Sequence, residues 1–91
     1  MNQFRIEDSF AIQPDLFAFA GELVQGEARL GMSFEVPEAG HKWRFTIRSV
    51  EFIRKADGRE LIGLMVDNEK PGCLPGLGTG WTAELHEQFN G

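Results

Sequence analysis

The chain has 91 residues, which is enough for one compact domain and too few for two. Hydrophobic residues make up 42% of it and charged residues 25%, the usage of an ordinary globular domain, so a disordered or fibrous chain is excluded. A domain of this size buries only about two-thirds of its unfolded surface, which disfavours a self-contained cofactor enzyme. The net charge of −5 disfavours binding to polyphosphates and gives no reason to expect DNA as a partner.

The N-terminal residues and the cysteine content indicate the cellular compartment in which this protein is expected. Residues 1–5 lack the basic stretch and apolar run of an export signal, and no apolar segment is long enough to span a membrane. Cys73 is the only cysteine, so no internal disulfide can form and a reducing environment suits the chain. We therefore expect a cytoplasmic protein without membrane contact.

Two strands are predicted before residue 25. In residues 4–12 apolar side chains alternate with polar ones, the period of a half-buried strand, and Asp8 interrupts the apolar side. Pro14-Asp15 ends this segment, and residues 16–24 predict a second strand. The inward side chains are expected to be Phe4, Ile6, Phe10 and Ile12 in the first strand and Phe17, Phe19 and Leu23 in the second.

Two more strands are predicted between residues 26 and 54. After a reversal at Gln25-Gly26, residues 28–36 alternate most cleanly of all, until Pro37 ends the pattern and residues 37–40 form a turn. In residues 41–54 the apolar parity changes between Ile47 and Val50. A strand that keeps Val50 and Phe52 inward after this change needs a bulge or bend between Arg48 and Val50.

The last part of the chain predicts a hairpin, a central strand, a loop and a final strand. Asp57-Gly58 marks the hairpin turn, and residues 60–66 are apolar on both sides, as in a central strand. Residues 67–80 form a loop rich in Gly and Pro. Residues 81–89 fit either a strand or a helix, and we favour the strand. The fold class expected is all-β: a single domain over 1–91, a small closed or nearly closed antiparallel β-barrel of about six strands.

Several segments together resemble a known family. Ile6–Ile12, followed by Gly21, Gly26 and Gly31 at five-residue spacing, resembles the β-barrel that follows the GTPase domain in elongation factor Tu and its relatives. Ile47–Phe52 and Leu61–Leu64 are similar to two later strands of that barrel. The resemblance covers most of the chain and implies the same barrel, here standing alone without a GTPase domain. In the family this barrel contacts the GTPase domain and the aminoacyl end of tRNA.

The glycines have structural roles of their own, and the sequence lacks the nucleotide-binding motif of the family's GTPase domain. Gly26 suits a hairpin that needs a positive φ, while Gly21 and Gly31, expected within strands, would permit bulges or close strand approach. No G-x-x-x-x-G-K-[ST] motif exists, so GTP hydrolysis is not implied.

Residues 42–59 form a basic segment, with six basic and two acidic residues (+4), between segments of net charge −5 and −4. Its cations could contact an anion or an RNA backbone, or pair across strands with acids such as Glu22, Glu27 or Glu35, which we favour. A row on the outer face of one strand is expected for Lys42, Arg44 and Arg48. The remaining cations of the segment are Arg54, Lys55 and Arg59.

Other polar features predict no catalytic or metal site. His41 and His86 lack partners at metal-ligand spacing and are expected to be exposed, and Cys73 has no neighbouring base. Residues 76–80 superficially resemble a phosphate cradle, but no helix follows them, so a mobile loop is expected. Around it, Leu74, Leu77 and Trp81 could form an exposed apolar patch for a partner protein, although we favour Trp81 as a plug at one end of the barrel.

The sequence therefore predicts a non-enzymatic binding or accessory module that needs no cofactor and acts through contacts with another protein. The alternative is a module that binds RNA or a tRNA end through residues 42–59, which the acidic net charge disfavours.

Overall fold

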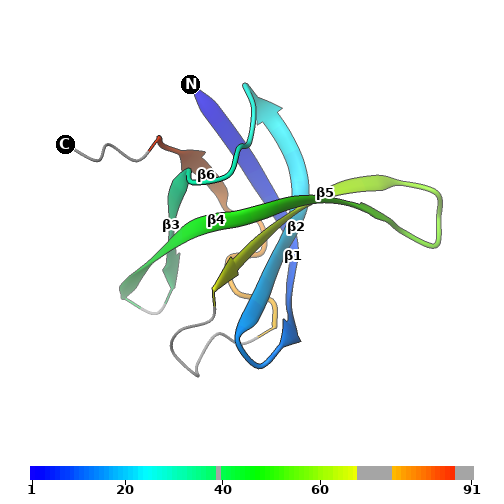
Figure 1. The fold of residues 1–91 in the computed structure, drawn as a ribbon, viewed down its shortest axis with the longest axis horizontal. Helices are drawn as coiled ribbons and strands as arrows, with labels where there is room; N and C mark the ends of the chain where they lie inside the picture. The colour runs from blue at the N-terminus through cyan, green and yellow to red at the C-terminus, as the bar shows by residue number, and fades with distance from the viewer. Residues whose placement is uncertain (39, 68–74, 88–91) are drawn as a thin grey trace.

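The computed structural model describes residues 1–38, 40–67 and 75–87, and these form an all-β structure. Figure 1 shows long curved strands wrapping around a common interior. The strands are β1 (Asn2–Gln13), β2 (Leu16–Gln25), β3 (Ser33–Glu38), β4 (His41–Arg54), β5 (Glu60–Asp67) and β6 (Thr82–Leu85). The strand predicted at the C-terminal end is thus confirmed over residues 82–85, and no helix in the described ranges is long and apolar enough to cross a membrane.

The strands form one antiparallel sheet in the order β3-β4-β5-β2-β1-β6. Its two edge strands meet between Ser33 and His86, whose backbones exchange hydrogen bonds of 2.7 and 2.8 Å. This single bridge closes the sheet almost completely into a barrel, as the sequence predicts. The central position predicted for β5 is also confirmed, since it pairs with β4 on one side and β2 on the other.

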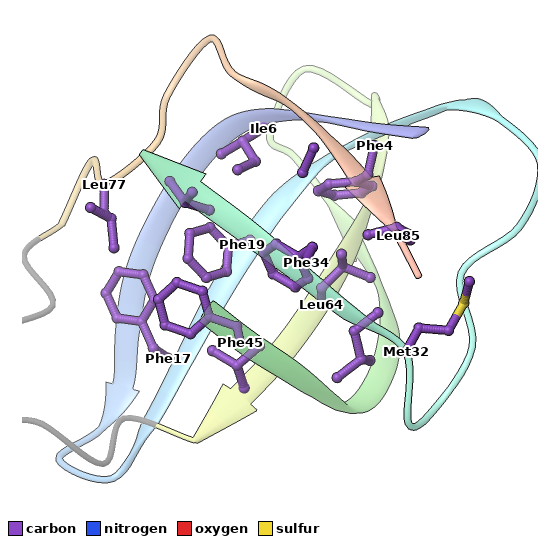
Figure 2. Close-up of a cluster of buried hydrophobic side chains, with 14 residues drawn as sticks. Phe4, Ile6, Phe17, Phe19, Met32, Phe34, Phe45, Leu64, Leu77 and Leu85 are labelled. Atoms are coloured by element: carbon purple, nitrogen blue, oxygen red, sulfur yellow. The ribbon is translucent and has the colours of Figure 1, made fainter. Parts of the chain in front are cut away.

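Aromatic rings fill the barrel interior. Phe19 lies at the centre of this cluster, with ring centroids 5.2 Å from Phe17, 5.3 Å from Phe34 and 4.9 Å from Phe45, all edge-to-face (Figure 2). Each of these rings occupies an inward position of its strand and is nearly or fully buried. Such edge-to-face pairs add to the hydrophobic gain of burial, so this cluster joins β2 to β3 and β4 across the interior.

A bulge in β1 changes which side chains face the core. The pairing with β2 shifts between Ile6 and Asp8, so Glu7 is an extra residue in the ladder. Ser9 then points inward and donates a hydrogen bond of 2.8 Å to the carbonyl of Leu77. The prediction that Phe10 and Ile12 face inward is therefore wrong: Phe10 is half-buried and Ile12 is 45% exposed.

Gly21 of β2 lies beside this bulge. A Cβ at this position would come within 1.9 Å of the backbone oxygen of Arg5, so the two strands approach too closely for any side chain. The close strand approach predicted for Gly21 is confirmed. The positive φ predicted for Gly26 is confirmed as well, at 75°.

Residues 28–32 are a turn and not the start of a strand, so this part of the prediction is wrong. The φ of Gly31 is 87°, and β3 begins only at Ser33. Gly31 donates a backbone hydrogen bond of 2.9 Å to the carbonyl of Ile47, while the amide of Ile47 donates one of 2.8 Å to the carbonyl of Met32. The alternation continues through the turn in sequence, but the positive φ reverses the chain and leaves Leu30 66% exposed.

The bulge predicted in β4 is present at Arg48, because the pairing with β5 shifts between Ile47 and Ser49. Beyond it, β4 and β5 continue past the barrel as a hairpin that projects sideways in Figure 1. We call residues 49–62 the arm. The prediction that Phe52 faces the core is wrong: its side chain is 80% exposed, because the arm has left the barrel by that point. The Asp57-Gly58 turn forms the tip, with a φ of 88° at Gly58.

Candidate functional site

Three cations of the basic segment lie in ion pairs. Arg48 on β4 contacts Asp67 at 2.6 Å, and Arg54 contacts Glu60 across the arm at 3.1 Å. Arg59 contacts Glu7 at 2.9 Å and Glu22 at 3.2 Å. Pairs this exposed contribute little to stability, but they occupy cations that a polyanion would need. Of the acids named from the sequence, Glu22 takes part, whereas Glu27 contacts Arg29 instead.

Arg59 makes the most extended of these contacts. Its guanidinium joins Glu7 of β1 to Glu22 of β2, and the second oxygen of Glu22 accepts a hydrogen bond of 2.8 Å from Arg5. The hydrogen bond with Glu7, followed by the charges of Glu7 and Glu22, raises the pKa of Arg59 above its ordinary value. The side chain therefore stays cationic and ties the end of the arm, next to its Asp57-Gly58 turn, to β1 and β2.

The other cations of the segment lie far apart. Lys42, Arg44 and Lys55 make no ion pair with any residue in the described ranges, and all are exposed. Lys42 and Arg44 are at the beginning of β4, while Lys55 follows its last residue, at the arm's tip. At about 3.3 Å per residue, Arg44 and Lys55 are separated by roughly 35 Å. The expected outward row along β4 exists, but its unpaired charges do not form one basic surface.

The loop before β6 is attached to β1. The amide of Gly76 donates to the carbonyl of Ser9 at 2.8 Å, and that of Gly80 donates to the carbonyl of Ile6 at 2.8 Å. Leu77 is only 5% exposed and belongs to the core (Figure 2), so it cannot line the exposed patch predicted for it. Leu74 and Cys73 lie outside the described residues.

The same loop is not arranged as a phosphate cradle. The amide of Thr79 donates to the carbonyl of Gly76 at 3.2 Å, and that of Trp81 donates to the carbonyl of Gly78 at 2.9 Å. With the amides of Gly76 and Gly80 also in use, most of the donors that could face an anion are already bonded to protein. A nearby carboxylate, Glu38, further disfavours a negatively charged ligand.

Trp81, which precedes β6, connects this edge of the barrel to β3. Its indole nitrogen donates a hydrogen bond of 3.2 Å to the carbonyl of Glu35, at the part of β3 that β6 does not pair with. The ring remains 44% exposed, so the prediction that it plugs the barrel is wrong. It borders an open hollow of about 390 Å³, lined by Pro37, Glu38, Gly76, Gly78, Thr79, Gly80 and Trp81.

Gly78 shows how closely this hollow is built onto the core. Its φ is 74°, and a Cβ there would lie 2.6 Å from Cγ1 of Val36 and 3.1 Å from Cδ1 of Ile6. The loop backbone therefore rests directly on buried side chains. Three of the seven residues that line the hollow are glycines, and Trp81 is the one aromatic residue among the seven.

The histidines are separated from each other, and neither lines this hollow. His41 pairs with Glu38 at one end of β3, while His86 bridges Ser33 at the other end. Nε2 of His86 lies 3.8 Å from Glu84 on the exposed surface. Within residues 1–38, 40–67 and 75–87, no group of three His, Cys, Asp or Glu side chains is placed to hold a metal ion.

One surface feature is absent from the sequence-based prediction. The edge of β4 that faces away from β5 is uncovered along the arm, and Phe52 lies in the middle of it. The available signal was the length of the predicted strands: the segment 41–54 has 14 residues and follows a segment of nine, 28–36, so the longer strand must extend past its neighbour. Comparison with family models, with curated proteins and with solved structures finds no match for this chain.

Proposed function

We propose that this chain is a non-enzymatic binding module of the cytoplasm that acts through contacts with another protein. The observation that carries this proposal is the state of Trp81: its indole N–H is bonded to the carbonyl of Glu35, yet the ring remains 44% exposed beside an open hollow. The ring is thus held in one position while much of its apolar surface meets water.

A ring held in this way is suited to protein recognition. Tryptophan is enriched among the residues that dominate binding energy at interfaces, and an immobilised side chain loses little entropy when a partner packs on it. The glycines that line the hollow let a partner's main chain approach closely, because no side chain projects from Gly76, Gly78 or Gly80. We infer that a partner inserts an apolar or extended segment into this hollow.

The resemblance to the second domain of elongation-factor-Tu-like GTPases is part of the proposal. A nearly closed barrel of six antiparallel strands supports it, as does the close strand contact at Gly21. In that family the barrel works by docking onto other macromolecules. This chain would use the barrel in the same general way, with a surface of its own.

RNA binding is the alternative, and the ion pairs make it the weaker one. Arg48, Arg54 and Arg59 are paired with carboxylates, and the unpaired cations stand at opposite ends of β4. Affinity for a phosphate backbone falls steeply with salt and needs several neighbouring cations. We expect tRNA to bind weakly at low salt and not at physiological salt. Tight binding at physiological salt that is lost in a Lys42→Ala, Arg44→Ala variant would favour the RNA-binding function instead.

The direct test uses the tagged protein as bait in a native lysate, with the captured proteins identified by mass spectrometry at several salt concentrations. Trp81→Ala is the test variant, and Ile12→Ala is its control because Ile12 has a nearly identical exposure, 45%, on another part of the surface. We expect one or more proteins to be captured by the wild type and by Ile12→Ala but lost with Trp81→Ala.

Thermal unfolding of each variant checks that the loss is not caused by unfolding. Trp81→Phe separates the two roles of the residue, since it keeps an aromatic ring but loses the N–H that bonds to Glu35. If all four proteins capture the same set, or none captures anything above background, the proposal is wrong.

A further inference from the structure

The uncovered edge of β4 begins and ends at definite residues. On the side away from β5, the backbone of Ile47 is bonded to Gly31 and Met32, so the edge is occupied there. The pairing with β3 ends at Thr46, and no strand among the described residues lies alongside β4 beyond that point. At the other end the chain turns at residues 56–58. The free edge therefore runs from Ser49 to Lys55.

The backbone groups that this edge presents follow from the pairing within the arm. The amide of Lys55 donates to the carbonyl of Arg59 at 2.8 Å, so Lys55 directs its backbone toward β5. Successive residues of a strand direct their N–H and C=O groups to opposite sides. Val50, Phe52 and Arg54 must then direct theirs outward, where they form an unpaired row of donors and acceptors.

Two of the three side chains along this row, Val50 and Phe52, are apolar, and the third is Arg54. Phe52 is 80% exposed, and it lies opposite the half-buried Ile62 in the pairing with β5. Val50, two residues earlier on the same face, is also half-buried. Natural edges are commonly protected by proline or by a bulge, but residues 49–55 contain no proline and the bulge of β4 precedes them. An extended edge with an exposed aromatic ring at its centre is suited to pairing with another strand.

We propose that the edges of β4 in two copies of this chain pair with each other, antiparallel, about a two-fold axis at Phe52. The free stretch 49–55 is symmetric about residue 52, so this register uses the whole edge of both copies. Ser49 of one copy lies opposite Lys55 of the other, and pairing therefore stops on both sides where the free edge stops. The dimer would join two barrels through one continuous sheet.

The charges favour this register. Phe52 meets Phe52 of the second copy, an aromatic cross-strand pair. On the opposite face Glu51 lies beside Ile53 of the second copy and diagonal to its Lys55. Neither Glu51 nor Lys55 has an ion pair with any described residue of its own chain, so both are available. The two-fold axis makes this attractive pair occur twice, against a single Glu51–Glu51 diagonal across the axis.

Of the two neighbouring registers, the one centred on Ile53 leaves Ser49 and Val50 unpaired, because they would face the turn at residues 56–58. The one centred on Glu51 is electrostatically unfavourable. Shifting the axis to Glu51 preserves the backbone pairing but places Glu51 opposite Glu51, and Arg48 opposite Arg54. Like charges directly opposite each other destabilise a strand pair. An edge of seven residues is a small interface, so we expect dissociation constants in the range of roughly 10 µM to 1 mM.

Sedimentation velocity on the intact chain over about 1 µM to 1 mM tests the proposal. The wild type should pass from monomer to dimer with rising concentration. Glu51→Lys and Lys55→Glu, each alone, should weaken the dimer about tenfold by placing like charges together. The double variant Glu51→Lys, Lys55→Glu reverses both charges and should restore it. Glu84→Lys, at an exposed position of β6, is the control and should leave the dimer unchanged.

Single cysteines test the register, in a Cys73→Ser background so that no other thiol is present. Directly opposed, hydrogen-bonded residues have Cα atoms about 5.5 Å apart, within the range of a disulfide. Phe52→Cys should therefore give a covalent dimer on mild oxidation, in preference to Glu51→Cys and to the control Val24→Cys, which is at an exposed site on β2.

A wild type that stays monomeric up to about 1 mM overturns the proposal. The edge would then be available for pairing with a strand of another protein. Failure of the double variant to restore the dimer, or preferential cross-linking of Glu51→Cys, overturns the register. These results are independent of the proposed function, since Trp81 lies on a different part of the barrel and Trp81→Ala should leave the dimer intact.

Discussion

The two halves of β4 have similar sequences and opposite surroundings. In the half that belongs to the barrel, residues 41–46 pair with β3, and Phe45 and Ile47 are 6% and 2% exposed. In the half that belongs to the arm, β5 flanks it alone, and Phe52 is 80% exposed. Each half is paired with one strand, so the difference lies in what packs on the inward face: Phe45 contacts the rings of Phe19 and Phe34, and Phe52 has no such ring contact among the described residues. The comparison also locates the part of the chain that is free to contact another molecule.

The largest difference between barrel and arm should appear when the same residue type is removed from each. Phe19→Ala deletes the ring at the centre of the aromatic cluster and should lower the free energy of unfolding by about 3–5 kcal/mol. Phe52→Ala should change it by less than about 0.5 kcal/mol, because little of its surface is buried. Denaturant unfolding at low protein concentration measures both. Equal losses would mean that Phe52 is packed in solution and that the arm folds back on the barrel.

Proline substitutions should distinguish the two sides of β4 within the arm. Glu51→Pro removes an amide that points to β5 and should cost about 3 kcal/mol of unfolding free energy, since the ladder is broken. Phe52→Pro removes an amide that points outward, so its cost should be smaller by about 1–2 kcal/mol. Chemical unfolding of the two variants gives the difference. A larger loss for Phe52→Pro would reverse the direction assigned to the free edge.

The smallest effect is expected where the arm is tied to the barrel. Arg59→Gln removes the contacts with Glu7 and Glu22, whereas the control Arg54→Gln removes only a pair within the arm. Backbone amides of residues 60–62 should exchange with solvent faster in Arg59→Gln than in Arg54→Gln, with little change in global stability. Identical exchange in both variants would show that the contacts of Arg59 do not hold the arm.

The pH dependence of this contact follows from the pKa of Arg59. This pKa is raised above its ordinary value, chiefly by the hydrogen bond with Glu7, so the folded state favours the charged guanidinium. The contribution is then fully present below the ordinary pKa and is lost only as the pH rises through the raised value. Exchange at residues 60–62 should accordingly show no step from arginine deprotonation between about pH 6 and pH 9.

Much of the fold could be predicted from alternation and turn residues. The bulge at Arg48 follows from the change of parity between Ile47 and Val50, and the arm's tip follows from Asp57-Gly58. The errors arise where backbone geometry changes without a change in hydrophobic pattern. Gly31 reverses the chain inside an alternating segment, and the bulge at Glu7 turns Ser9 inward in place of Phe10.

The surface was harder to predict than the core. Leu77 sits in a segment rich in Gly and Pro that resembles an exposed loop, yet hydrogen bonds to Ser9 and Ile6 draw that segment onto the barrel and bury the side chain. Trp81 could be assigned to a strand pattern, but its bond to Glu35 depends on where β6 ends relative to β3. Such contacts join residues far apart in the chain, so local periodicity carries no information about them.

By itself, the sequence determined the class of the fold: short-period hydrophobic alternation, interrupted by glycine and proline, can bury its apolar side only in a sheet that packs on itself. It also determined that the positive charge gathers in residues 42–59. Only the tertiary structure decided which of those cations face carboxylates, that Trp81 borders a hollow, and that β4 extends beyond the barrel with an unpaired edge. These properties depend on strand register and on the relative lengths of neighbouring strands, which are set when the whole sheet closes.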